Sequence, residues 1–145
     1  PEASVLVNAR PDVARAVGAQ GVQLGRDDLA PAEARAVLGP GWIGASVHSI
    51  AEAEAAAAEG ADFLLVGAIY PTASHPGRAP AGIGLVRAAA ALGKPVIAIG
   101  GVTAERTAEL RDAGAYGAAA IRALWSADDP ARAALALLAP WMDEA

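Results

Sequence analysis

His48 and His75 are the two histidines of this 145-residue chain, and each follows closely on an apolar run. An imidazole ring exchanges protons near neutral pH, so a histidine can act as a general acid or base. His48 lies in the segment SVHS, whereas His75 lies in the long segment YPTASHPGRAP, residues 70–80. A histidine next to a helix start is also common as a plain polar residue, so its residue type alone leaves the role of His48 open.

A second group of residues has the chemistry of an anion site. Gly100 and Gly101 precede a helical stretch, and glycines there let backbone N–H groups approach a negatively charged ligand. Arg122 follows the next apolar run, after Ile121, and a guanidinium offers several donors in a fork. A glycine pair by itself also suits a tight turn. Together with Arg122, the pair predicts a phosphate site.

Charged residues also crowd the short segment Gly25-Arg26-Asp27-Asp28. Its carboxylates could bind a hard cation, but aspartates equally suit the positive end of a following helix. We expect the helix to account for at least one of them. Arg26 is expected to face solvent or a ligand rather than the core.

Apolar runs and helical stretches alternate along the whole chain. The segments AVGAQGVQL, AEGADFLLV and DAGAYGAAA each join an alanine-rich stretch through a glycine to an apolar run. Glycine can end a helix in the left-handed conformation, and an unbroken apolar run is typical of a buried parallel strand. Ser49 and Glu52 have the spacing of a capping box. We predict strands at 4–8, 21–25, 42–47, 62–69, 95–99 and 117–121, and helices at 11–17, 31–38, 50–59, 82–92, 104–113 and 130–142.

This alternation favours an α/β fold, either an open doubly wound sheet or a (β/α)8 barrel. In both architectures, ligands bind at the carboxyl ends of the strands. The residues considered above lie at the carboxyl ends of predicted strands or in the segments that follow them, so we expect them to meet at one edge of the sheet. The interval between the fourth and fifth strands is the longest, and residues 70–80 account for the excess.

Composition excludes several classes of function. The net charge is −5, with no basic block of the kind that binds nucleic acid. No apolar run reaches the roughly 18 residues of a membrane span, and no signal peptide is visible, so we expect a cytoplasmic protein without a membrane partner. The chain has no cysteine, which excludes disulfides and thiol catalysis.

Three longer segments resemble the thiamine phosphate synthase/thiazole tautomerase superfamily. They are VNARPDVARAVGAQGVQLGRDDL, GASVHSIAEAEAAAAEGADFLLVGAIYPT and PVIAIGGVTAERTAELRDAGAYGAAAI. The resemblance implies a (β/α)8 TIM-barrel fold of which this chain holds the last six βα units. Residues 1–145 would then form a single TIM-barrel-like domain that lacks the first two units. Such a chain is either a fragment or a shortened member that covers its open edges by association, so a homo-oligomer is expected.

Within the superfamily, the SVHS segment resembles the tautomerase branch. That resemblance implies an isomerase that aromatises a thiazole phosphate carboxylate, with His48 as the proton shuttle and with neither metal nor other cofactor. The phosphate would lie on Gly100, Gly101, Ile121 and Arg122. The remaining substrate contacts would come from Arg26, Ser46, Thr72, Ser74 and His75.

Two alternatives stay open. The first is the thiamine phosphate synthase reaction, a Mg²⁺-dependent transfer between a pyrimidine pyrophosphate and thiazole phosphate, in which Asp28 would be a metal ligand. Against it, Ala9 replaces the aspartate of the synthase Asn-Asp pair, Gln23 replaces a histidine, and residues 71–75 lack the synthase lysine. The second alternative is a noncatalytic regulatory relative that binds thiazole phosphate.

Overall fold

The computed structural model describes residues 3–72, 77 and 79–142. Its strands are β1 (Leu6–Asn8), β2 (Gly21–Leu24), β3 (Trp42–Val47), β4 (Phe63–Gly67), β5 (Val96–Ile99) and β6 (Gly117–Ala119). Its helices are α1 (Pro11–Val17), α2 (Pro31–Leu38), α3 (Ile50–Ala58), α4 (Ile83–Ala90), α5 (Ala104–Asp112), α6 (Arg122–Trp125) and α7 (Pro130–Met142).

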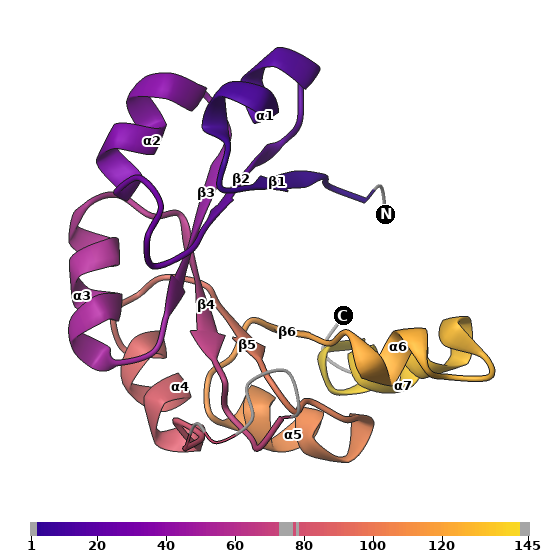
Figure 1. The fold of residues 1–145 in the computed structure, drawn as a ribbon. Coiled ribbons are helices and arrows are strands. Elements are labelled where there is room, and N and C mark those ends of the chain that lie inside the picture. Colours follow the sequence, from indigo (N-terminus) through magenta and orange to yellow (C-terminus); the bar gives the residue numbers. More distant parts are fainter. Residues whose placement is uncertain (1–2, 73–76, 78, 143–145) are drawn as a thin grey trace.

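The six strands form one parallel sheet in the order of the sequence, β1-β2-β3-β4-β5-β6. The sheet is curved, and α1 to α5 lie along its outer side (Figure 1). Within the described residues, β1 and β6 each pair with one neighbour only, so the sheet is a half-barrel with two open edges. The predicted TIM-barrel type is confirmed, with six βα units present.

Side chains on the two faces of the sheet have different environments. Alternate residues such as Val22, Leu64 and Val96 are completely buried beneath the helices. The residues between them, including Gln23, Leu65 and Ile97, are only half-buried because they face the hollow side of the half-barrel. Strand side chains alternate between faces, so the half-buried set is the one that a ligand inside the hollow can contact.

Element boundaries agree with the predicted ones to within one or two residues, with one omission. The sequence did not predict α6, a four-residue helix directly after β6. A helix of one turn is too short to show the helical repeat of apolar residues. None of the helices in the described part of the chain has the length and hydrophobicity to cross a bilayer.

The start of α3 departs from a simple capping box. Ser49 caps the helix as predicted, because its Oγ accepts a hydrogen bond from the Glu52 N–H at 3.2 Å. The Glu52 carboxylate, however, accepts from the backbone N–H of His48 at 2.7 Å, one residue before the cap. This reach brings the Glu52 side chain to the carboxyl end of β3, where the candidate site lies.

Candidate active site

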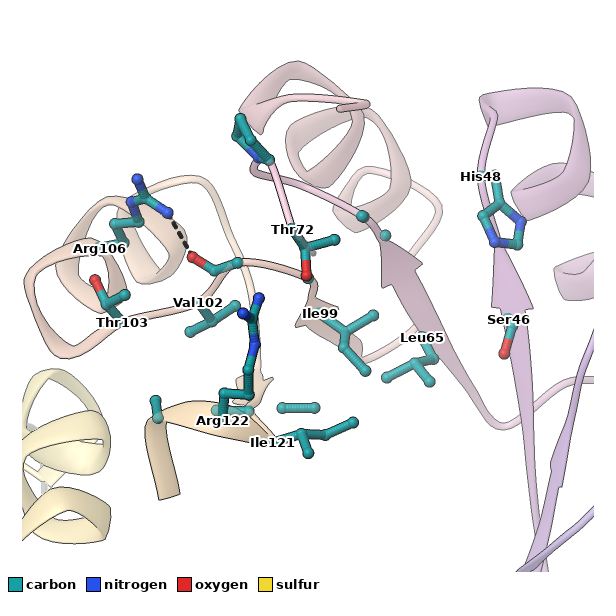
Figure 2. Close-up of a pocket in the computed structure, with 18 of the residues that line it drawn as sticks. Ser46, His48, Leu65, Thr72, Ile99, Val102, Thr103, Arg106, Ile121 and Arg122 are labelled. Carbon is teal, nitrogen blue, oxygen red and sulfur yellow. Dashed lines mark hydrogen bonds between the residues drawn. The ribbon is translucent and has the colours of Figure 1, made fainter. Parts of the chain in front are cut away.

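A cavity of about 580 Å³ lies at the carboxyl ends of the strands. Figure 2 shows Ser46 and His48 on one side of it and Val102 and Arg122 on the other, with Leu65 and Ile99 between them. The cavity therefore has two polar ends separated by an apolar floor.

The turn at Gly100 and Gly101 has a backbone that only glycine adopts easily. Their φ angles are 95° and 66°, a region where side chains are strained. A Cβ on Gly100 would lie 2.5 Å from the Cβ of Ala68, and a Cβ on Gly101 would lie 2.6 Å from the carbonyl oxygen of Pro71. The glycine pair thus lets this turn pass close to the segment that follows β4.

Ile121 and Arg122 also line the cavity, at the start of α6. The Arg122 side chain extends into the cavity toward the segment that carries Thr72 (Figure 2). Its guanidinium makes no hydrogen bond or ion pair with the residues that the structure describes. The structure therefore brings the four predicted phosphate residues to one end of the cavity, where the Arg122 cation has no counter-ion within the described part of the chain.

At the opposite end, His48 and Arg26 are both bonded to Glu52. The Nδ1 atom of His48 lies 3.2 Å from Oε2 of Glu52, and Arg26 bonds to Oε1 at 2.7 Å. Burial opposes ionisation of Glu52. The hydrogen bonds from His48 and the charge of Arg26 outweigh it and hold the pKa of Glu52 below its ordinary value. Arg26 thus lines the cavity but already has a carboxylate partner.

Ser46 lies two residues before His48 and also lines the cavity. Its hydroxyl accepts a hydrogen bond from Nε2 of Gln23 at 3.0 Å. Gly44 makes room for this contact, because a Cβ there would lie 2.2 Å from Oε1 of Gln23. The Gln23 amide thus orients the Ser46 oxygen from the neighbouring strand.

Of the remaining predicted site residues, one lines the cavity and the others lie outside it or outside the described residues. Thr72 lines the cavity, whereas Ser74 and His75 lie outside the described residues. Asp28 lies in a shallower neighbouring hollow. Its Oδ2 accepts from the Gly25 N–H at 2.6 Å, so it closes the turn after β2. Among the described residues, no three acidic or histidine side chains gather as a metal-binding group.

Sequence reasoning missed Arg106, which lines the cavity from α5. Its guanidinium donates to the Gly101 carbonyl at 2.5 Å and lies 4.5 Å from the centre of the Tyr70 ring. The Tyr70 hydroxyl donates to Glu109 at 2.7 Å. These contacts join the segment after β4 to the glycine turn and to α5, so they hold two walls of the cavity together.

The contacts of Tyr70 should raise the pH at which its phenol ionises. Burial, followed by the hydrogen bond to Glu109 and its negative charge, raises the pKa of Tyr70 to about 12 from its ordinary value of 10.0. We expect an alkaline absorbance titration to show a tyrosine that ionises near pH 12 and that disappears in Tyr70→Phe. Because the folded chain favours the protonated phenol, its stabilising effect is complete below pH 10 and is lost as the pH rises toward 12. A Tyr70 phenol that ionises near pH 10 would contradict this expectation.

Comparison with known proteins identifies the family. The family model described as thiamine monophosphate synthase matches residues 2–124. The chain belongs to the thiamine monophosphate synthase family. Thiamine-phosphate synthase of Mycolicibacterium gilvum is 48% identical over 145 residues, which cover 99% of this chain and 61% of that protein. The thiamine-phosphate synthase of Salinispora arenicola is 50% identical over 139 residues, covering 94% of this chain and 67% of that protein.

Solved structures agree with membership of the thiamine monophosphate synthase family. The thiamine phosphate pyrophosphorylase from Pyrococcus furiosus has a TM-score of 0.88 and 35% identity, over 97% of this chain and 68% of that one. A 3-hexulose-6-phosphate synthase, at 24% identity and a TM-score of 0.69 over 90% of this chain and 66% of that one, shares the fold. The chain spans about three fifths of the length of the first curated relatives that it matches.

These relatives overturn the expected tautomerase activity and isomerase class. Family members that are 48–50% identical to this chain are named thiamine-phosphate synthase, which is a transferase. The tautomerase interpretation depended on the four residues of the SVHS segment and on changes at positions 9, 23 and 71–75. A likeness of four residues carries less weight than identity at nearly half of all positions.

Proposed function

We propose that this chain has the thiamine phosphate synthase activity, the transfer that joins a pyrimidine pyrophosphate to thiazole phosphate and releases pyrophosphate. The observation that carries the proposal is the cation of Arg122, which lies with the glycine turn at one end of a cavity of about 580 Å³ and has no carboxylate partner among the described residues. The names of the relatives supply the reaction class.

The phosphate of the thiazole is proposed to lie at the Arg122 end. Backbone N–H groups at Gly100 and Gly101 precede α5, and a helix start favours a negative charge. The guanidinium of Arg122 would donate two charge-assisted hydrogen bonds to phosphate oxygens. Arg106 holds the Gly101 carbonyl, which fixes the turn before the ligand arrives.

The two rings are proposed to lie over the apolar floor formed by Leu65 and Ile99. Apolar contact there removes water from the rings and holds them side by side, which favours reaction between bound partners. Ser46 and His48 would contact the ring edge farthest from the phosphate. Thr72, Ser74, His75 and Arg26 are proposed as further contacts of the pyrophosphate substrate.

The residues fit a magnesium ion that is shared with substrate rather than enclosed by protein. Mg²⁺ is usually bound by one or two carboxylates, with phosphates and water as its other ligands. Asp28 supplies one carboxylate after β2, and among the described residues its hydrogen bond is the one that Oδ2 accepts from Gly25. Asp28 would hold the ion, whose charge would neutralise the departing pyrophosphate. The expectation of no cofactor is therefore replaced by a proposal of Mg²⁺.

Position 9 offers a test of this metal assignment. Ala9 is the described non-glycine residue with a left-handed backbone, at φ 63°, and its N–H bonds to the Gln23 carbonyl beside the β2 turn. Aspartate and asparagine tolerate this backbone better than alanine. Ala9→Asp is expected to lower the Mg²⁺ concentration for half-maximal rate by about tenfold, because a second carboxylate raises affinity. Ala9→Asn, with the same backbone preference and no charge, should leave it unchanged. Equal effects of the two variants would contradict the role of charge.

The proposed activity is tested by mixing the protein with pyrimidine pyrophosphate, thiazole phosphate and Mg²⁺ and measuring thiamine phosphate by chromatography. The expected result is product that appears only when all three are present. Binding of thiazole phosphate without turnover would instead support the noncatalytic relative. We further propose that residues 1–145 form one domain without the family's first two βα units. A homo-oligomer that covers β1 and β6, in the cytoplasm, is also proposed, and sedimentation would measure its size.

A further inference from the structure

Glu52 joins three groups that come from different parts of the fold. Its Oε1 accepts from Arg26 after β2, and its Oε2 accepts from the backbone N–H of His48 and lies 3.2 Å from the ring Nδ1. A capping box would satisfy the helix start by itself, through the N–H of the cap residue. Glu52 bonds instead to the residue before the cap, so its position is explained by His48 rather than by the helix.

The charge of Glu52 fixes which nitrogen of His48 carries the proton. An ionised carboxylate only accepts hydrogen bonds, so the Nδ1 atom facing it must be the donor. The Arg26 guanidinium, 2.7 Å from Oε1, favours the ionised form of Glu52. In a neutral imidazole with Nδ1 protonated, Nε2 has a bare lone pair.

We propose that Glu52 is a positioning residue that holds His48 with its proton on Nδ1 and presents the bare Nε2 to the cavity as an acceptor. The Nε2 atom then accepts a hydrogen bond from an N–H or O–H group of the ligand and has no proton to donate to a phosphate oxygen. The Nε2 acceptor and the Arg122 donor thus prefer opposite groups, which sets the direction in which thiazole phosphate lies between them. This last step depends on the proposed function, whereas the protonation of His48 does not.

The test is a nuclear magnetic resonance measurement of the imidazole nitrogens of His48 at a pH where the ring is neutral. His48→Gln assigns the signals, since it removes one histidine and leaves His75. In the wild-type protein, the protonated-type nitrogen signal is expected at Nδ1. In Glu52→Gln the signal is expected to move toward Nε2. Glu54 is an exposed glutamate of the same helix, and in the control variant Glu54→Gln the signal is expected to stay at Nδ1. A wild-type ring protonated at Nε2 would overturn the proposal without any variant, and so would an unchanged ring in folded Glu52→Gln.

Inorganic phosphate separates this proposal from the proposed function. Added phosphate is expected to shift the backbone amide signals of Gly100 and Gly101 and to leave the His48 ring in its neutral form. Protonation of the ring by bound phosphate would overturn the acceptor role of His48. Unmoved glycine amides would count against the phosphate site alone. In turnover, Glu52→Gln should lower kcat by about 10- to 100-fold with little change in KM, the range seen when a carboxylate that orients a metal-bound histidine is lost.

Discussion

Replacing Arg122 with methionine is expected to weaken binding of thiazole phosphate by about 10- to 100-fold. A hydrogen bond to a charged group is worth about 1.5–3 kcal/mol, and about 1.4 kcal/mol corresponds to tenfold in affinity. Methionine keeps much of the length and the apolar stem of the arginine side chain, so the loss of affinity measures the contribution of the guanidinium. Because Arg122 is exposed and its guanidinium makes no ion pair or hydrogen bond with the described residues, the folded chain should keep its stability.

A pair of ligands makes this prediction specific. Calorimetry with the same thiazole lacking its phosphate should give equal affinities for the wild-type chain and Arg122→Met. Without the phosphate, neither protein forms the guanidinium–phosphate interaction. Arg122→Lys should lose part of the affinity, since it keeps the charge but not the fork of donors. Arg87→Met, on the exposed side of α4, is the matched control. If Arg122→Met weakened both ligands equally, its role would be structural rather than phosphate binding.

The phosphate end of the cavity could be predicted because its chemistry is local in sequence. Gly100 and Gly101 stand between a strand and a helix, and Arg122 follows the next strand, so strand order alone brings them together. Arg106 shows the opposite case. It is an ordinary helical arginine in the sequence, and its function depends on Tyr70, whose position beside α5 is set by packing of the β4 segment.

Glu52 lies between these cases. Its spacing from Ser49 predicted the cap, and the structure contains that cap. The same glutamate is four residues from His48, a distance at which helical side chains meet, so its second contact had a signal that the capping pattern obscured. The mistaken tautomerase assignment has a related cause, because members of one fold can differ in reaction while sharing short segments.

The glycine turn gives the other large effect, and the chain provides its own control. Gly93 and Gly100 both have positive φ angles, 75° and 95°, but a Cβ on Gly93 would meet nothing within 4 Å. Gly93→Ala should therefore cost only the backbone strain, about 1 kcal/mol of unfolding free energy. Gly100→Ala adds a collision with Ala68, at 2.5 Å between the two Cβ atoms, and overpacking of this kind costs about 1–3 kcal/mol more.

The same collision should also weaken phosphate binding. This effect would distinguish a turn that binds the phosphate from one that only stabilises the fold. To relieve the collision, the Gly100 backbone must move away from the β4 segment, which would displace the N–H groups of Gly100 and Gly101 from the proposed phosphate position. A displacement of about 1 Å can cost about 100-fold in rate. Urea denaturation would measure the stability effect, and thiazole phosphate binding with the rate of thiamine phosphate formation would measure the functional effect, in Gly100→Ala and Gly93→Ala. Normal binding by a destabilised Gly100→Ala chain would show that the turn supports the fold but does not hold the phosphate, and the anion would then have to be bound by Arg122 alone.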